Sequence, residues 1–563
     1  MTTLFPRALI VKEGRALAPI WLGAAVTIIA GTQAGMLDGA LLAFVLGAAA
    51  LGVFSIGHEY GNRTLTSLLA QPLSRSRLLL SKVVVLAPLL VLLSLVAAFV
   101  LFRADGIERM LGGAAHAPTP AQGDIGRLGA LAAHPVDATL ASRWRLAIVV
   151  LTPLLGLCVG PWLTMVFRNA TAGLVFTLAV PAALWIAGQI ARAASVGFDF
   201  VDLEVGSPFG YSPALVLMIV GVLIVCLIAA VHGRLLFIGL EALDTPRDLL
   251  PATLKRRPLA EKARVTSTRT GARRRGPLLL FVRKEVRLYG LAFAIAGLYA
   301  IGWIALWLAG AVTYLADSTF QSLASMYALF IAMLVGAISI AEERALGTAD
   351  TQILQPWSFW KQCLTKLATV SLVSLVLGLA VPVGLEAVLP LIARSRSVGP
   401  DLGFFRYLLP NPLNGAVATI LLTMFFSSYV SSLCVGGLRA LLAALPLSFS
   451  LASLSTYLSY AVDWLWHTVR VSYGLREFWW NGLPTAADED FRTLFLYSRW
   501  MATITFLGFA ALLLFLLLRN VRSGELGTSL AKKQLPCVAV YVAVAIVSLR
   551  GGESVLRWWL LTH

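Results

Sequence analysis

The stretch VVVLAPLLVLLSLVAAFVLF (residues 83–102) contains twenty residues, none of which is Asp, Glu, Lys or Arg. A helix needs about 20 apolar residues to cross the hydrocarbon core of a membrane. Lipid offers no partner to backbone N–H and C=O groups, so the stretch is expected to form a helix that satisfies them internally. Eleven further runs of at least 19 residues also lack charged residues: 16–37, 39–57, 146–167, 169–191, 205–231, 288–316, 318–341, 367–385, 407–438, 440–462 and 500–518.

Twelve such runs predict an all-α polytopic membrane protein with about 12 transmembrane helices. The composition agrees, since 58% of the residues are hydrophobic and only 13% are charged. These values exclude a water-soluble globular enzyme and a disordered protein. One more uncharged run, 534–549, has 16 residues and is either a short span or a re-entrant segment.

The net charge of +17 would by itself suggest a nucleic-acid partner. Its distribution indicates otherwise. If the N-terminus lies in the cytoplasm and the runs alternate, the cytoplasmic stretches carry 30 basic and 11 acidic residues, and the rest of the chain carries 15 and 17. This asymmetry follows the positive-inside rule. We therefore expect a multi-pass protein of the cell (inner) membrane, with a cytoplasmic N-terminus and no nucleic-acid partner.

The chain also repeats itself. EYGNRTLTSLLAQPLSRSRLLLSK (59–82) and ERALGTADTQILQPWSFWKQCLTK (343–366) align without a gap at a shift of 284 residues. A Lys-Glu pair precedes the first run of each half, in LIVKEGRAL (9–17) and LFVRKEVRL (280–288). Each half has six runs, an even number, so the sequence predicts two parallel repeats of the same orientation.

These features divide the chain into four parts. They are a first six-helix repeat (1–231), a basic cytoplasmic linker (232–279), a second six-helix repeat (280–518) and a C-terminal tail (519–563) that holds the sixteen-residue run. The linker segment 255–277 is basic and almost free of large apolar residues, which is typical of a solvated tether. Contact with anionic lipid headgroups is a secondary role open to it.

The duplicated segments have a defined pattern. In the first, leucines share one face of a short predicted helix, Pro72 cannot continue that helix, and Ser74 is suited to cap the next one. Pro356 and Ser358 repeat the arrangement in the second half. Two gap-free copies favour a structure that docks onto a partner over an ordinary cytoplasmic loop.

The pattern E-x(3)-[RG]-T-x(6)-Q-P-x-S-x(7)-K resembles the coupling-helix region of ABC-2 type transporter permeases. The Lys-Glu segments resemble the amphipathic connecting helix of that family. The resemblance implies ATPase coupling by Glu59, Arg63, Thr64, Pro72, Ser74, Arg75, Lys82, Glu343, Gly347, Thr348, Pro356, Ser358 and Lys366. It places Lys12, Glu13, Lys284 and Glu285 in the connecting helices.

The resemblance further implies an exporter subunit that moves a hydrophobic or amphipathic substrate, such as a drug, natural product or lipid. The chain contains no G-x-x-x-x-G-K-[ST] loop and no Gly-Lys pair at all. A phosphate cradle needs that loop, so we expect no enzyme activity, catalytic residue, cofactor or metal in this chain. ATP and Mg²⁺ would bind to a separate cytoplasmic ABC ATPase, in two copies per chain, and membrane lipids would be the other partners.

An ion-gradient-driven secondary transporter of the six-plus-six helix type is the alternative. It predicts a short loop after the second span and charged residues in the middle of spans, whereas the loop here is long and duplicated. For a substrate pathway the sequence offers only weak candidates, which are Glu386, Trp303 and Trp307.

Overall fold

The computed structural model describes residues 7–33, 37–61, 64, 74–115, 135–196, 213–239, 277–309, 317–345, 347, 358–392, 412–472, 488–523 and 528–562. Within these residues the chain is helical and forms no strand. Thirteen of the helical segments are long and apolar enough to cross a membrane. The protein is therefore an all-α polytopic membrane protein, as the sequence predicts.

The described residues of the first half form six helices, one for each of the first six uncharged runs. They are α1 (Arg7–Gln33), α2 (Leu37–Gly61), α4 (Arg75–Ala115), α6 (Pro135–Phe167), α7 (Ala170–Val196) and α9 (Pro213–Gly239). Helix α9 continues past residue 231, where the first repeat was expected to end. The rest of the predicted linker, up to the start of the next helix, lies outside the described residues.

The second half has the same order of spans with one more at its end. It consists of α11 (Pro277–Leu288), α12 (Gly290–Leu308), α13 (Asp317–Ala345), α15 (Phe359–Leu375), the π-helical turn η3 (Val376–Ala380), α16 (Val381–Ile392), α18 (Pro412–Leu433), α19 (Gly437–Ser472), α20 (Asp488–Ser523) and α21 (Thr528–Thr562). Helices α15, η3 and α16 together make one span. Helix α21 contains the run 534–549, which is thus part of a thirteenth helix of spanning length.

The two halves differ at the segment before their first span. In the second half this segment is a separate helix, α11, because the backbone at Tyr289 (φ −90°, ψ 16°) is not helical. In the first half the corresponding segment forms the opening turns of α1 and runs without a break into the span. The predicted connecting helix is therefore a distinct element in one half only.

The boundaries around the duplicated segments repeat at the shift of 284 residues. Helix α2 ends at Gly61 and α13 at Ala345, while α4 begins at Arg75 and α15 at Phe359. Ser74 and Ser358 each precede the new helix, as predicted, and Ser358 has the extended backbone of an N-cap residue, although its hydroxyl makes no capping hydrogen bond. The duplication seen in the sequence therefore extends to the local structure.

Small residues bring the second and fourth spans of each half close together. A Cβ on Gly52 of α2 would lie 1.8 Å from the carbonyl oxygen of Gly156 in α6, so only glycine fits there. A Cβ on its counterpart in α13, Gly336, would lie 2.6 Å from the carbonyl oxygen of Met424 in α18. Without a hydrophobic force between helices in lipid, such close approach of backbones is a main source of association.

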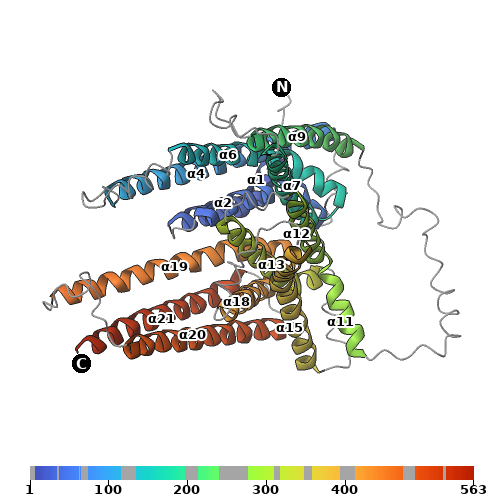
Figure 1. Cartoon of the computed structure of the whole chain (residues 1–563). Coiled ribbons are helices and arrows are strands. Elements are labelled where there is room, and N and C mark those ends of the chain that lie inside the picture. Colours follow the sequence, from blue (N-terminus) through green and yellow to red (C-terminus); the bar gives the residue numbers. More distant parts are fainter. Residues whose placement is uncertain are drawn as a thin grey trace.

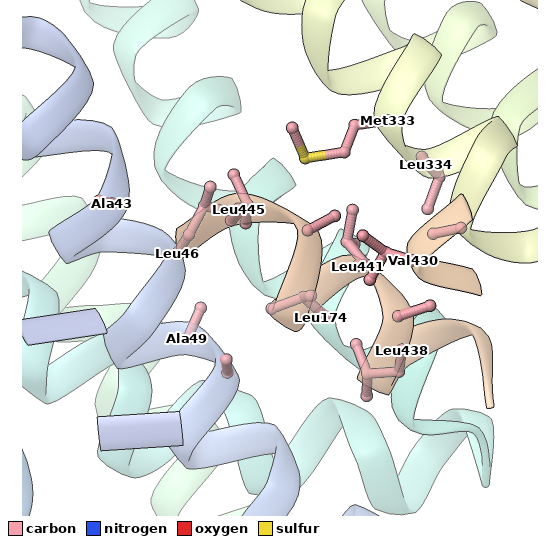
Figure 2. Close-up of a cluster of buried hydrophobic side chains, with 14 of the residues drawn as sticks. Ala43, Leu46, Ala49, Leu174, Met333, Leu334, Val430, Leu438, Leu441 and Leu445 are labelled. Carbon is pink, nitrogen blue, oxygen red and sulfur yellow. The ribbon is translucent and has the colours of Figure 1, made fainter. Parts of the chain in front are cut away.

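The halves contact each other reciprocally (Figure 1). Helix α1 of the first half packs against α19 of the second, and α12 of the second packs against α7 of the first. In each contact the first span of one half meets the fifth span of the other. Figure 2 shows Leu441 and Leu445 of α19 between side chains of α2, such as Leu46, and those of α13 and α18. This reciprocity is what two parallel repeats around one axis produce.

Among the described residues, helix α21 has no counterpart in the first half, and it packs against α19 and α20. Asn520 and Gln534 join α20 to α21 through two reciprocal amide hydrogen bonds of 2.7 and 3.1 Å. Asn520 also donates to Ser432 of α18 at 2.9 Å. This buried polar contact fixes the last helix to the second half.

Candidate functional site

A buried ionic cluster joins three helices close to the first duplicated segment. It lies near the start of α1, the end of α2 and the start of α4. Lys82 Nζ lies 2.6 Å from Glu13 and 3.8 Å from Glu59, and Lys12 Nζ lies 2.9 Å from Glu59. Thr64 adds a hydroxyl hydrogen bond to the Glu59 carboxylate. The side chains of Glu13, Glu59 and Lys82 are at most 4% exposed. We call Lys12, Glu13, His58, Glu59, Thr64 and Lys82 the first ionic cluster.

His58 occupies the space between the two glutamates of this cluster. Its Nε2 is 3.1 Å from Glu59 and 3.8 Å from Glu13, and its Nδ1 is 2.6 Å from the carbonyl oxygen of Phe54. Lys82 also donates to the carbonyl oxygen of Ser55 at 2.8 Å. Three helices are therefore connected by charge-assisted contacts, which are the strong kind of hydrogen bond.

The second half builds the same arrangement from the equivalent residues. Lys366 of α15 contacts both Glu343 of α13 and, at 3.9 Å, Glu285 of α11, while Lys284 lies 3.3 Å from Glu343. We call Lys284, Glu285, Glu343 and Lys366 the second ionic cluster. Each Lys–Glu pairing of the first cluster thus recurs, so the duplication preserves a three-helix junction and not merely single residues.

The carboxyl groups meet differently in the second cluster. Glu285 is hydrogen-bonded directly to Glu343. Burial, together with the adjacent Glu343 carboxylate, raises the pKa of Glu285 to about 7. Glu342, which corresponds to His58, turns away and accepts a hydrogen bond from the backbone N–H of Gly437 in α19.

Two of the predicted coupling residues in the first half lie outside the first ionic cluster. Ser74 is exposed at the start of α4. Arg75 follows it and donates to the carbonyl oxygen of Ile238 near the end of α9. Four others, Arg63, Pro72, Thr348 and Pro356, lie outside the described residues.

Gly347 has a structural role of its own. It follows α13 with φ +68°, in the left-handed region that glycine adopts without strain, and its N–H donates to the carbonyl oxygen of Arg344 at 3.0 Å. The sequence repeats align this glycine with Arg63, so the two halves leave the second span through different residues.

Glu59 and Glu343 are buried among the chain's own side chains, being 0% and 3% exposed. Their carboxylates are thus positioned to hold the junction together. Their role in ATPase coupling stays a prediction, and so does that of the exposed Ser74 and Ser358.

The weak pathway candidates lie elsewhere. Trp303 is buried in α12, where it packs with Trp185 and Ile186 of α7 at a contact between the halves, and Trp307 lies beside it. Glu386 belongs to α16, and its side chain is outside the described part of the chain. Their place on a substrate pathway remains a prediction.

Sequence reasoning missed His58. The alignment of the repeats pairs it with Glu342, and that difference directly beside an aligned glutamate was a usable signal. Glu13, His58 and Glu59 are close enough to share a cation, with ligand atoms within 4.8 Å of one another. Lys82 and Lys12 already supply the compensating positive charge at 2.6 and 2.9 Å, so the arrangement is an ion-pair junction.

Comparison with known proteins adds one match. Residues 25–180 match a family described as ABC-2 family transporter protein. Searches of curated proteins and of solved structures find no match. The matched segment includes α2, α4 and α6 and, within the first ionic cluster, His58, Glu59, Thr64 and Lys82. Over residues 25–180 the chain is therefore similar to ABC-2 family transporter proteins, which supports the resemblance seen in the sequence.

Proposed function

We propose that the chain is the transmembrane subunit of an exporter driven by separate ABC ATPases. In this proposal it moves a hydrophobic or amphipathic substrate, such as a drug, natural product or lipid, out of the cytoplasm or the inner leaflet. The chain itself binds no nucleotide, and two copies of a cytoplasmic ATPase engage its two halves. The proposed location is the cell (inner) membrane, with the N-terminus in the cytoplasm.

The observation that carries this proposal is the paired ionic clusters. Each ties the segment before the first span to the ends of the second and third spans, directly beside a duplicated segment. A partner that moved the two duplicated segments would therefore move three helices of each half at once. The family match supports the energy source, because ABC-type permeases work with ATPase subunits.

Transport in inside-out membrane vesicles tests the proposal. We expect uptake of a hydrophobic dye into vesicles that contain the chain and its ATPase when ATP is added, and the same uptake after an uncoupler has removed the proton gradient. Vesicles with the chain alone should give no ATP-dependent uptake. Uptake that follows an ion gradient and ignores ATP would support the six-plus-six secondary transporter instead.

A further inference from the structure

The two ionic clusters contain the same pairs of glutamates and lysines but differ at one position. Residue 58 is a histidine between Glu13 and Glu59, whereas the equivalent Glu342 points to Gly437 and leaves Glu285 and Glu343 facing each other. Two glutamates thus share a buried site in both halves. What lies between them differs.

In the first cluster, both ring nitrogens of His58 face oxygen atoms that only accept hydrogen bonds. Nδ1 is 2.6 Å from the carbonyl oxygen of Phe54, and Nε2 is 3.1 Å from Glu59. Both Glu59 and Glu13 are paired with lysine ammonium groups, at 2.9 and 2.6 Å. A neutral imidazole has one N–H and would turn a lone pair toward one of these acceptors. A second N–H on the ring would direct a hydrogen toward the acceptors on both sides.

In the second cluster, two carboxyl groups are hydrogen-bonded to each other. Two ionised carboxylates have no hydrogen to donate, so the contact between Glu285 and Glu343 requires a proton on one of them. Lys366 and Lys284 both lie against Glu343, which favours its ionised form and leaves the proton on Glu285. The groups facing Glu285 are Lys284 and Tyr289 from its own segment, Glu343 from α13 and Lys366 from α15.

We propose that each ionic cluster binds one proton between its two glutamates, on His58 in the first half and on Glu285 in the second. The proton comes from water on the same side as the cluster and returns to it. With this proton bound, the two clusters have the same net charge. The proton is held by an imidazole ring in the first cluster and by a carboxyl group in the second. This site does not depend on the proposed function.

Release of the proton from Glu285 has a structural consequence. The hydrogen bond between α11 and α13 is replaced by two facing carboxylates, which repel each other. Since the pKa of Glu285 is raised to about 7 in the folded chain, its contribution to stability is complete below the ordinary glutamate pKa. It is lost as the pH rises through about 7. The midpoint temperature of thermal unfolding should therefore decrease when the pH is raised from 5 to 8. In Glu285→Gln this decrease should be smaller.

Infrared spectroscopy of the full chain in detergent tests the site directly, through the C=O stretching band of a protonated carboxylic acid. We expect a band that disappears as the pH rises through about 7. Glu285→Gln should lack this band. Glu342→Gln, which alters the neighbouring buried carboxyl, should keep it. A band that persists in Glu285→Gln with the same pH dependence would overturn the proposal, as would its absence from the unaltered chain at pH 5.

Exchange of the distinguishing residue gives a second test that does not require Glu285→Gln to fold. In Glu342→His the imidazolium should take over the position of the proton, so the band from Glu285 should vanish. In His58→Glu a new band should appear from the first cluster. Size-exclusion chromatography establishes that each variant is folded. Carboxyl spectra identical to that of the unaltered chain in both folded exchange variants would contradict a proton site between the glutamates.

Discussion

Replacement of Lys82 by methionine is expected to lower the free energy of unfolding by about 3–5 kcal/mol, the usual cost of removing one partner of a buried ion pair. Lys82 is 4% exposed and is the cation closest to Glu13, at 2.6 Å. Methionine keeps most of the volume of the side chain but leaves that carboxylate buried without its nearest counter-charge. The loss is measured by denaturant or thermal unfolding of the purified chain in detergent.

Two further variants serve as comparisons for Lys82→Met. Arg77→Met removes a charge from the same helix at an exposed position and should cost less than about 0.5 kcal/mol. Lys366→Met removes the equivalent lysine of the second cluster, whose side chain is 16% exposed. Its loss of unfolding free energy should lie between those of the other two variants. Equal stability of Lys82→Met and Arg77→Met would show that the first ionic cluster does not hold the junction together.

The double variant Glu59→Gln, Glu343→Gln is expected to separate ATP hydrolysis from transport. Both residues lie where the segment before the first span meets the second and third spans, and both are paired with lysines. Glutamine keeps the shape but removes the charge-assisted contacts, so movement of one helix is no longer passed to the others. We expect the coupling free energy to decrease by at least about 1.4 kcal/mol, which corresponds to a decrease in transport of at least about tenfold. ATP hydrolysis by the partner should continue.

The matched control for the double variant is Glu342→Gln. Glu342 is adjacent to Glu343 but contacts Gly437 and not the lysines of the cluster, so its replacement should leave transport per ATP unchanged. Both rates are measured in the same reconstituted vesicles. Normal transport per ATP in the double variant would exclude a coupling role for these two glutamates.

Much of the fold could be predicted from the sequence because the physical constraint of the membrane is strong. An uncharged run such as 83–102 has few options in lipid other than a helix, and each such run contains most of a described helix or overlaps one. The run 534–549 was too short to decide, since α21 gains its length from the flanking residues of Thr528–Thr562. Hydropathy does not record how far a helix continues into the polar region.

The candidate site could be predicted only in part. The repeats marked Lys12, Glu59 and Lys82, because identity at a fixed shift is visible in one sequence. That Glu13 and Lys82 approach to 2.6 Å depends on the packing of α1 against α4, which no local pattern specifies. The orientation of His58 toward the cluster, and of Glu342 away from it, likewise depends on rotamers and tertiary neighbours.

The central claim is that separate ATPases engage this permease beside its two ionic clusters. Photo-cross-linking residues placed at Ser74 and at Ser358, both exposed at the start of the third span of each half, test it most directly. A third at Tyr457, whose hydroxyl contacts Gln33 at the opposite end of α1 from Lys12, is the control. We predict that both Ser74 and Ser358 cross-link in native membranes to a protein that carries a phosphate-binding loop and hydrolyses ATP, and that Tyr457 does not. Failure of both serine positions to capture such an ATPase, or equal capture at Tyr457, would contradict the account.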